Sequence, residues 1–157
     1  FCADTNPELG ARLKTLGSGG GDRLLMLVRA VKPRARTLGE ASKPAAFIML
    51  ADDAVPFDAA AVEKNLLAGD RRGLALLATV RDRLATLTEA DFKPDLIHAL
   101  IDQIAQQSGA GMGPVSQGVR VAITGSGVSP GIGETLAVLG KASAMARIER
   151  CLKVYTT

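Results

Sequence analysis

The sequence has little of what metal centres and nucleophilic hydrolases need. Its 157 residues include one histidine, His98, and two cysteines, Cys2 and Cys151, near opposite ends of the chain. A single histidine cannot form a multi-histidine metal site, and a Ser-His triad built on it would have no other histidine to act as a base. Because the cysteines lack C-x-x-C spacing, neither a disulfide framework nor a zinc site is predicted. We expect no catalytic residue and no metal site, with His98 at the surface or boundary of a helix and Cys151 packed in the core.

Aromatic residues and long apolar runs are also scarce. Tryptophan is absent and only five aromatic residues occur, too few for an aromatic RNA-binding sheet. The longest apolar runs fall short of the roughly 18 residues of a membrane span, and Asp4 and Glu8 stand where a signal peptide would be apolar. We therefore expect a soluble, cytoplasmic, monomeric protein with no membrane partner. Because the chain begins with Phe1, we expect it to be a piece of a longer protein.

Charge is distributed unevenly. Residues 1–40 hold seven Lys/Arg and four Asp/Glu, residues 41–107 hold seven and ten, and residues 108–157 hold five and two. A polyanion would meet the two ends of the chain and avoid its centre. The alternative is an ordinary solvated helix face with basic side chains.

Hydrophobic periodicity with capping residues predicts an all-α fold of two small, packed helical bundles. Residues 1–21 are expected to be a flexible N-terminal segment, residues 22–107 a first subdomain, and residues 108–157 a second. Asp22, Asp58 and Asp70 are expected to cap helices. Pro94 is expected to open a helix that Gly109 closes, and Gly140 to stop a helix over residues 132–139. One predicted apolar stripe comprises Leu74, Leu77, Arg81, Leu84 and Leu87. Another comprises Leu96, Ile97, Leu100, Ile101 and Ile104. The adjacent acids Asp52 and Asp53 diverge in direction, so we expect them to lie in a loop without acid–base chemistry.

Residues 117–152 allow two incompatible interpretations. In the first, an apolar run followed by T-G-x5-G-I-G is a dinucleotide-binding turn between a strand over residues 119–123 and a helix. That interpretation is disfavoured because only 32 residues follow Gly125, Pro130 interrupts the loop, and no acidic residue stands at the distance needed for a ribose hydroxyl. A strand at residues 119–123 would support it, and a helix there would end it.

In the second interpretation the same residues carry an ordered series: R-V-A-I-T-G, S-P-G-I, E-T-L-A-V-L-G-K and A-R-I. This series resembles the C-terminal anticodon-binding region of bacterial-type glutamyl-tRNA synthetases, which are class I enzymes. A second, weaker block at residues 31–40 (VKPRARTLGE) is similar to the same family, so the resemblance covers roughly residues 22–152. The sequence departs from the family pattern at Gly118 (usually proline), Gly133 (commonly aromatic) and Ala142 (usually glutamate).

The resemblance implies an α-helical cage that grips the anticodon loop of tRNA(Glu) and positions the tRNA for glutamylation by an upstream catalytic domain in cis. It implies no cofactor for this fragment, and ATP and Mg²⁺ for the parent enzyme, whose ATP-site signatures are absent here. Arg34 would read the third anticodon base, and Arg36 belongs to the same basic block. The predicted RNA-binding residues are Arg34, Arg36, Arg120, Ser129, Pro130, Gly131 and Ile132.

Alternatives from other classes stay open at this point. The chain could be a helical protein-interaction module without RNA specificity or, least favoured, a nucleotide-cofactor-binding fragment. Arg34 could pair only with Glu40, and Ser129 and Pro130 could only cap the helix that follows them.

Overall fold

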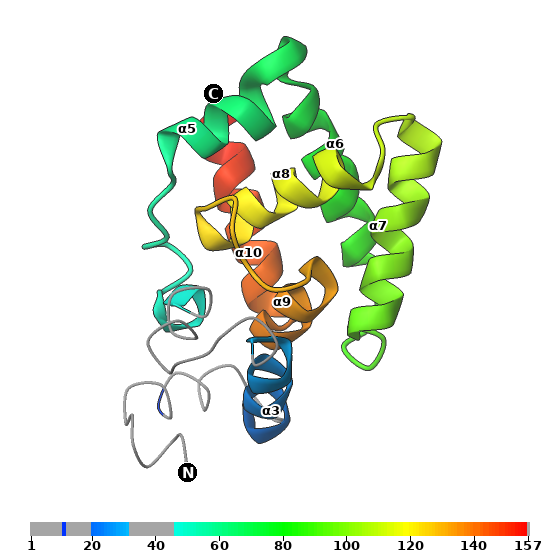
Figure 1. The fold of residues 1–157 in the computed structure, drawn as a ribbon. Helices are drawn as coiled ribbons and strands as arrows, with labels where there is room; N and C mark the ends of the chain where they lie inside the picture. The colour runs from blue at the N-terminus through cyan, green and yellow to red at the C-terminus, as the bar shows by residue number, and fades with distance from the viewer. Residues whose placement is uncertain (1–10, 12–19, 32–45, 157) are drawn as a thin grey trace.

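The computed structural model describes Ala11, residues 20–31 and residues 46–156, and these residues form helices and loops without a strand (Figure 1). The all-α prediction is therefore confirmed. The elements are α3 (Gly20–Val31), η2 (Ala46–Met49), α5 (Ala59–Val62), η3 (Glu63–Leu67), α6 (Ala68–Ala85), α7 (Pro94–Ser108), α8 (Met112–Thr124), α9 (Ile132–Leu139) and α10 (Lys141–Thr156).

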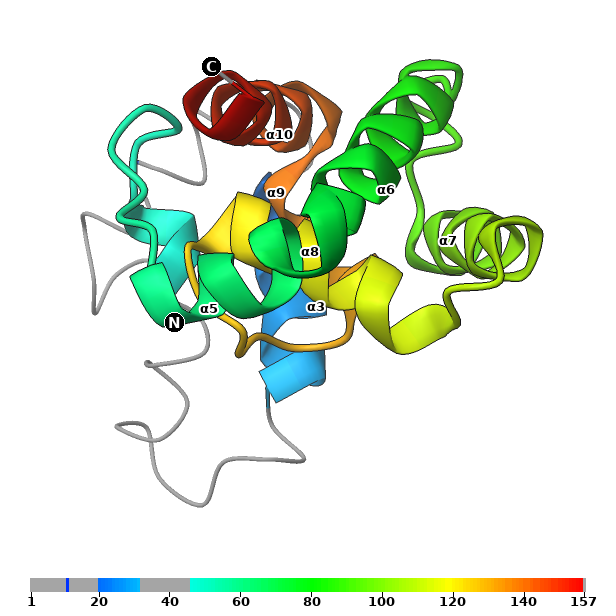
Figure 2. The ribbon, with the colours of Figure 1, turned by 90° about the horizontal axis from the view of Figure 1, so that it is seen from above.

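Helix α8 forms the centre of the fold. It packs against α6, α7, α9 and α10, and the two ribbon views agree on this central position (Figures 1 and 2). Val119, Val121, Ala122 and Ile123 are 0% exposed. Residues 121–123 follow one another around the helix, so burying all three requires neighbours on several sides of α8. Because residues 119–123 are helical, the dinucleotide interpretation is wrong.

Several predicted helix boundaries are confirmed because they depend on local chemistry. Asp58 is the N-cap of α5, and its Oδ1 accepts from Ala61 N at 3.0 Å. Pro94 is the first residue of α7, and Gly109 ends that helix in the left-handed conformation (φ 64°). Helix α9 has the predicted bounds and stops at Gly140, whose φ is 84°. A backbone in this region strongly favours glycine.

Four local predictions are wrong. Asp22 is not the cap of α3, because that helix begins at Gly20 and Asp22 lies within its first turn. Asp70 does not have the extended backbone of a cap residue but is left-handed (φ 56°), within a kink shared with Gly69 and Arg71. Val80, which is fully buried, occupies the inward position predicted for Arg81. Leu96 is 46% exposed and not part of the inward face of α7. In both helices most of the predicted stripe is buried, namely Leu74, Leu77 and Leu84 on α6 and Ile97, Leu100, Ile101 and Ile104 on α7.

The core does not show where the predicted subdomains divide. One hydrophobic cluster extends from Phe47 to Leu152, and α3 packs against α9 across the predicted boundary. The segments 1–21, 22–107 and 108–157 therefore remain predictions, the first lying almost wholly outside the described residues.

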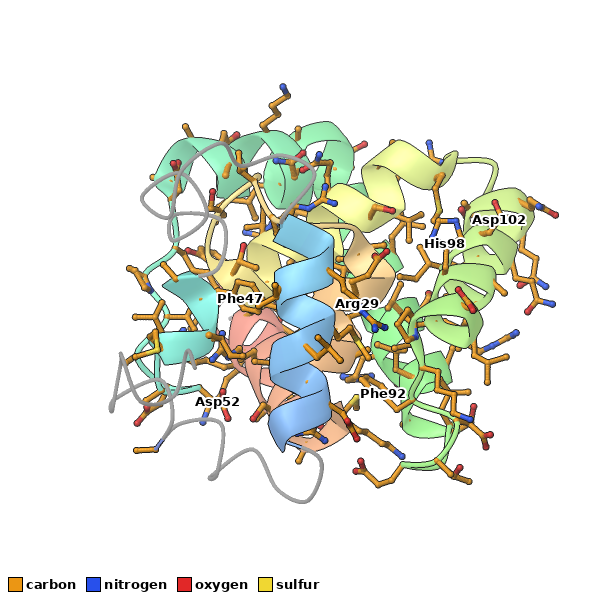
Figure 3. All side chains as sticks on the ribbon, turned by 60° about the horizontal axis from the view of Figure 1, so that its bottom comes forward. Arg29, Phe47, Asp52, Phe92, His98 and Asp102 are labelled. Atoms are coloured by element: carbon orange, nitrogen blue, oxygen red, sulfur yellow. The ribbon has the colours of Figure 1, made fainter. Side chains whose placement is uncertain are left out.

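Arg147 on α10 joins distant parts of the chain. Its side chain is fully buried, and its Nε donates to Asp52 Oδ1 at 2.8 Å. Nη1 donates to the carbonyl oxygens of Phe47 (3.0 Å) and Ile123 (2.8 Å), and Nη2 donates to that of Leu50 (2.7 Å). The segment around residues 47–52 is thereby fastened to the end of α8. Figure 3 shows Phe47 and Asp52 on the same side of α3.

Candidate functional site

The candidate site is the loop of residues 125–131 between α8 and α9. Gly125 ends α8 with φ 75°, and its carbonyl oxygen accepts from Asp58 N at 2.8 Å. A Cβ at this position would lie 1.9 Å from Pro56 O, so only glycine fits. The hydroxyl of Thr124 accepts from Ser126 N at 3.2 Å and tightens the turn. The start of the loop is therefore fixed by backbone contacts.

Arg120 braces the other half of the loop. Its Nε donates to Ser129 Oγ at 2.8 Å and its Nη2 donates to Pro130 O at 3.3 Å. Thr135 Oγ1 lies 2.8 Å from Gly131 O and 3.2 Å from Ser129 Oγ. Ser129 is only 8% exposed, and Pro130 is also buried. The structure thus brings together four of the predicted residues, Arg120, Ser129, Pro130 and Gly131, in a network that holds the loop in shape.

The alternative that Ser129 caps the following helix is wrong. The N-cap of α9 is Gly131, and no side chain makes the capping hydrogen bond. Ile132 is the first residue of α9 and is 4% exposed, so its side chain lies in the core.

Sequence reasoning missed the most exposed part of the loop. Val128 is 73% exposed, more than any other large apolar side chain in the described part of the chain. Its backbone N donates to Ser126 Oγ at 3.2 Å, so an apolar side chain is held toward solvent on a fixed backbone. The sequence offers only a weak signal, a single apolar residue between polar and glycine residues.

Glu134 determines which chemistry suits this loop. A Cβ on Gly131 would lie 2.1 Å from Glu134 Oε2, so the carboxylate lies directly over this glycine. An acid in the first turn of α9 is favoured by the helix dipole. Because a carboxylate repels phosphate, the loop near Gly131 suits contact with bases or apolar groups better than with a nucleic-acid backbone.

Gly133, where the related family commonly has an aromatic residue, is buried against the start of α7. A Cβ here would lie 2.5 Å from Pro94 O. The departure from the family pattern therefore has a structural reason, the close approach of α9 to Pro94.

The remaining predicted RNA-binding residues, Arg34 and Arg36, lie outside the described residues, as does Glu40. The roles predicted for them remain predictions.

The groups set aside as non-catalytic lie where expected. His98 is exposed on α7, one turn from Asp102 (Figure 3). Asp52 and Asp53 lie in a turn. Burial raises the pKa of the Cys151 thiol to about 12, and nearby Arg150 lowers it only in part. Within residues 20–31 and 46–156 there is no group of three or more His, Cys, Asp or Glu that could hold a metal ion.

None of the described helices is long and apolar enough to cross a lipid bilayer.

Comparison with known proteins identifies what this arrangement is similar to. The sequence profile of a family described as "Anticodon binding domain" matches residues 6–152. The chain is 35% identical over 139 residues to a glutamate–tRNA ligase of Myxococcus xanthus, covering 88% of this chain and 28% of the relative. It is 35% identical over 136 residues to glutamate–tRNA ligase 1 of Sphingopyxis alaskensis, covering 87% of this chain and 27% of that protein. The chain thus spans little more than a quarter of the length of these relatives.

A solved structure shares the fold. It is a glutamate tRNA ligase from Elizabethkingia meningosepticum in complex with its amino acid, matched with a TM-score of 0.72 at 22% identity. The match covers 94% of this chain and 28% of the other.

Proposed function

This chain belongs to the anticodon binding domain family, and from that premise we propose that it binds the anticodon loop of tRNA(Glu). In the longer protein, a glutamate–tRNA ligase, this contact would position the tRNA for glutamylation by a catalytic domain that uses ATP and Mg²⁺. The observation that carries the proposal is the family match over residues 6–152, which includes both the loop of residues 125–131 and the block around Arg34. The similarity to two glutamate–tRNA ligases supports the choice of tRNA.

The loop of residues 125–131 contacts the first two anticodon bases. Sequence-specific RNA recognition acts mainly on unstacked loop bases, through their edges and flat faces. A loop held by Arg120 from behind presents its more exposed residues, 126–128 and Gly131, without reorganisation, and such preorganisation lowers the entropic cost of binding. Val128 adds an apolar surface, and Glu134 disfavours a phosphate at the same place.

Arg120 acts mainly by positioning the loop. Two of its guanidinium nitrogens donate to Ser129 and Pro130, so its effect on RNA is transmitted through the shape of these residues. The side chain of Ile132 acts in the same way, as a buried anchor at the start of α9.

Arg34 reads the third anticodon base. A guanidinium group can donate to the O2 and N3 acceptors of cytosine and meets a different edge on guanine. We expect Arg34→Gln to leave folding nearly unchanged, to weaken binding of the C-containing loop by about 1–3 kcal/mol, and to relax the choice at that base. Fluorescence titration with anticodon stem-loops carrying C or G at the third position measures both effects.

Arg36→Gln is the matched control, since it removes a neighbouring charge from the same block. It should weaken both stem-loops equally by reducing the attraction for phosphate. If Arg34→Gln lowers the affinity for the two stem-loops equally, Arg34 contacts only a phosphate and does not read a base.

The first two bases are tested with stem-loops that differ only at those positions. The wild-type chain should prefer the glutamate anticodon, and Arg120→Met should lose much of that preference because the loop is no longer held. Binding that ignores the anticodon and varies little with salt would instead favour a protein-interaction module without RNA specificity.

A further inference from the structure

A second surface feature adjoins the loop. A solvent-open groove of about 540 Å³ lies between the η3–α6 segment and the start of α8, with the end of the α7–α8 connection on its rim. Three glycines, Gly69, Gly73 and Gly113, line it, so backbone is accessible over part of its wall. A Cβ on Gly113 would meet nothing within 4 Å, which shows how open this wall is.

The groove combines positive charge with an apolar floor. Lys64 and Arg72, both exposed, stand at its edge, and none of the described residues that line it is acidic. Arg72 Nη2 donates to Ser108 O at 3.0 Å, which holds the guanidinium at the rim. The floor includes Leu76 and three smaller apolar residues. An anionic group joined to a flat, partly apolar one fits this arrangement.

The backbone at one end of the groove is strained. Gly69, Asp70 and Arg71 are successive left-handed residues, with φ of 62°, 56° and 61°. Non-glycine residues avoid this region, and such outliers gather at binding sites more often than elsewhere. The turn leads into the stretch of α6 where Gly73 lies so close to η3 that a Cβ would be 2.0 Å from Asn65 O.

Gln117 connects the groove to the loop of residues 125–131. It lines the groove, and with its amide nitrogen toward the loop it donates to Gly127 O at 3.2 Å while its amide oxygen accepts from Arg120 Nη1 at 3.1 Å. From Gly113 to Arg120 the axis of α8 rises about 10 Å. One strand of RNA can therefore reach both places.

We propose that this groove holds one further nucleotide of the RNA strand bound by the loop. Its phosphate lies between Lys64 and Arg72, and its sugar and base lie over the apolar floor around Leu76. The contact is independent of base identity because a phosphate and a stacking face are common to all nucleotides. This inference rests on the proposed function and adds a contact outside the anticodon bases.

The test compares Lys64→Ala with Lys93→Ala. Lys93 is an exposed lysine that precedes α7, at the end of that helix opposite Ser108, about 22 Å away along its axis. We expect Lys64→Ala to weaken binding of every anticodon stem-loop roughly three- to tenfold and to lower the slope of log K against log salt by about 1. The preference among anticodons should be unchanged, and Lys93→Ala should behave as the wild type does.

A steric block gives a second measurement that does not depend on charge. Gly113→Trp places a large side chain in open space within the groove, so it should leave the circular dichroism spectrum unchanged and weaken RNA binding. Ala99→Trp, at an exposed position on α7, is its control.

The outcomes separate the two proposals. If stem-loops bind with anticodon preference but Lys64→Ala and Gly113→Trp match their controls, the groove assignment is wrong and the proposed function stands. If no variant or wild type distinguishes anticodons, the proposed function fails and the groove assignment falls with it. If 5′-AMP binds the wild type but not Gly113→Trp, and RNA binds both equally, the groove takes a free nucleotide. That result overturns the RNA assignment.

Discussion

Replacing Arg147 with methionine should destabilise the domain strongly, because this one side chain donates to four acceptors on distant parts of the chain. Methionine keeps much of the side-chain volume but donates no hydrogen bond. It would leave the buried carbonyl oxygen of Ile123 without this donor, and that of Phe47 with only the 3.4 Å hydrogen bond from Leu50 N. Leu50 O and the carboxylate of Asp52, 28% exposed, can be reached by water.

The magnitude follows from these four acceptors. An unsatisfied buried acceptor costs about 1–3 kcal/mol, which applies to Ile123 O, and the loss at Phe47 O, which keeps one long hydrogen bond from Leu50 N, is about 1–2 kcal/mol. The two accessible acceptors add about 0.5–1 kcal/mol each. Part of this loss is offset because a buried guanidinium no longer has to be desolvated. We therefore expect a decrease in unfolding free energy of about 3–5 kcal/mol, a large share of the roughly 5–15 kcal/mol typical of a domain.

Urea denaturation followed by circular dichroism measures this decrease. With an m value of about 2 kcal/mol/M, the midpoint should fall by about 2 M without a change in m. Arg150→Met is the matched control on the same helix: Arg150 donates one hydrogen bond to Val55 O (2.9 Å) and lies over the Phe57 ring (4.7 Å), so it should cost only about 1–2 kcal/mol. One ordinary hydrogen bond contributes about 1 kcal/mol to stability. If Arg147→Met lowers the unfolding free energy by less than that, the view that this arginine holds the fold is refuted.

Three further predictions concern glycine, cysteine and the braced loop. Gly125→Ala should destabilise the domain by about 3 kcal/mol or more, because φ is 75° and a Cβ would collide with Pro56 O. Gly118→Ala is the control: its Cβ would be 3.4 Å from the nearest side-chain atom, so the change should be neutral or stabilising by up to about 1 kcal/mol. Thermal unfolding of the two variants compares them. Burial raises the pKa of Cys151 to about 12, so as pH rises above 9.0 the unfolded chain loses the thiol proton before the folded chain does. The stability of the wild type should therefore fall between pH 9.0 and about 12 relative to that of Cys151→Ala. Parallel pH profiles of stability for the two proteins would contradict this. Arg120→Met should speed hydrogen exchange in residues 127–129 at a stability cost of about 1–2 kcal/mol, and unchanged exchange there would show that Arg120 does not brace the loop.

The sequence predicts the parts of this fold that depend on short-range chemistry. The cap at Asp58, the proline that opens α7 and the glycines that end α7 and α9 all act within a few residues of their own position. Such signals do not need the rest of the chain, and the predicted bounds of α9 match the observed ones to the residue.

Tertiary packing decides what the sequence could not. Residues 119–123 are rich in β-branched side chains and are compatible with a strand, but four neighbouring helices bury them as the central helix. The exposure of Val128 and the groove beside Lys64 likewise depend on segments that meet only in the folded chain.

Several residues that carry the resemblance to the synthetase family hold the fold and do not line the candidate interface. Arg147, in the A-R-I element, is buried and fastens residues 47–52 to α8. Lys141, in the G-K element, donates to the carbonyl oxygens of Ala85 and Leu87 at the end of α6. A motif that identifies a family can therefore reflect packing as much as recognition. The proposed RNA-binding loop contains only Gly125 of the R-V-A-I-T-G element and the first three residues of the S-P-G-I element.

The most direct test of anticodon reading is a low-salt titration of the wild-type chain with two anticodon stem-loops that differ only in the third anticodon base, C or G. If the domain reads that base, the C-containing loop binds more tightly, by roughly the 1–3 kcal/mol of one specific base contact. Equal affinities would contradict this and leave a basic helical module that binds RNA without reading the anticodon.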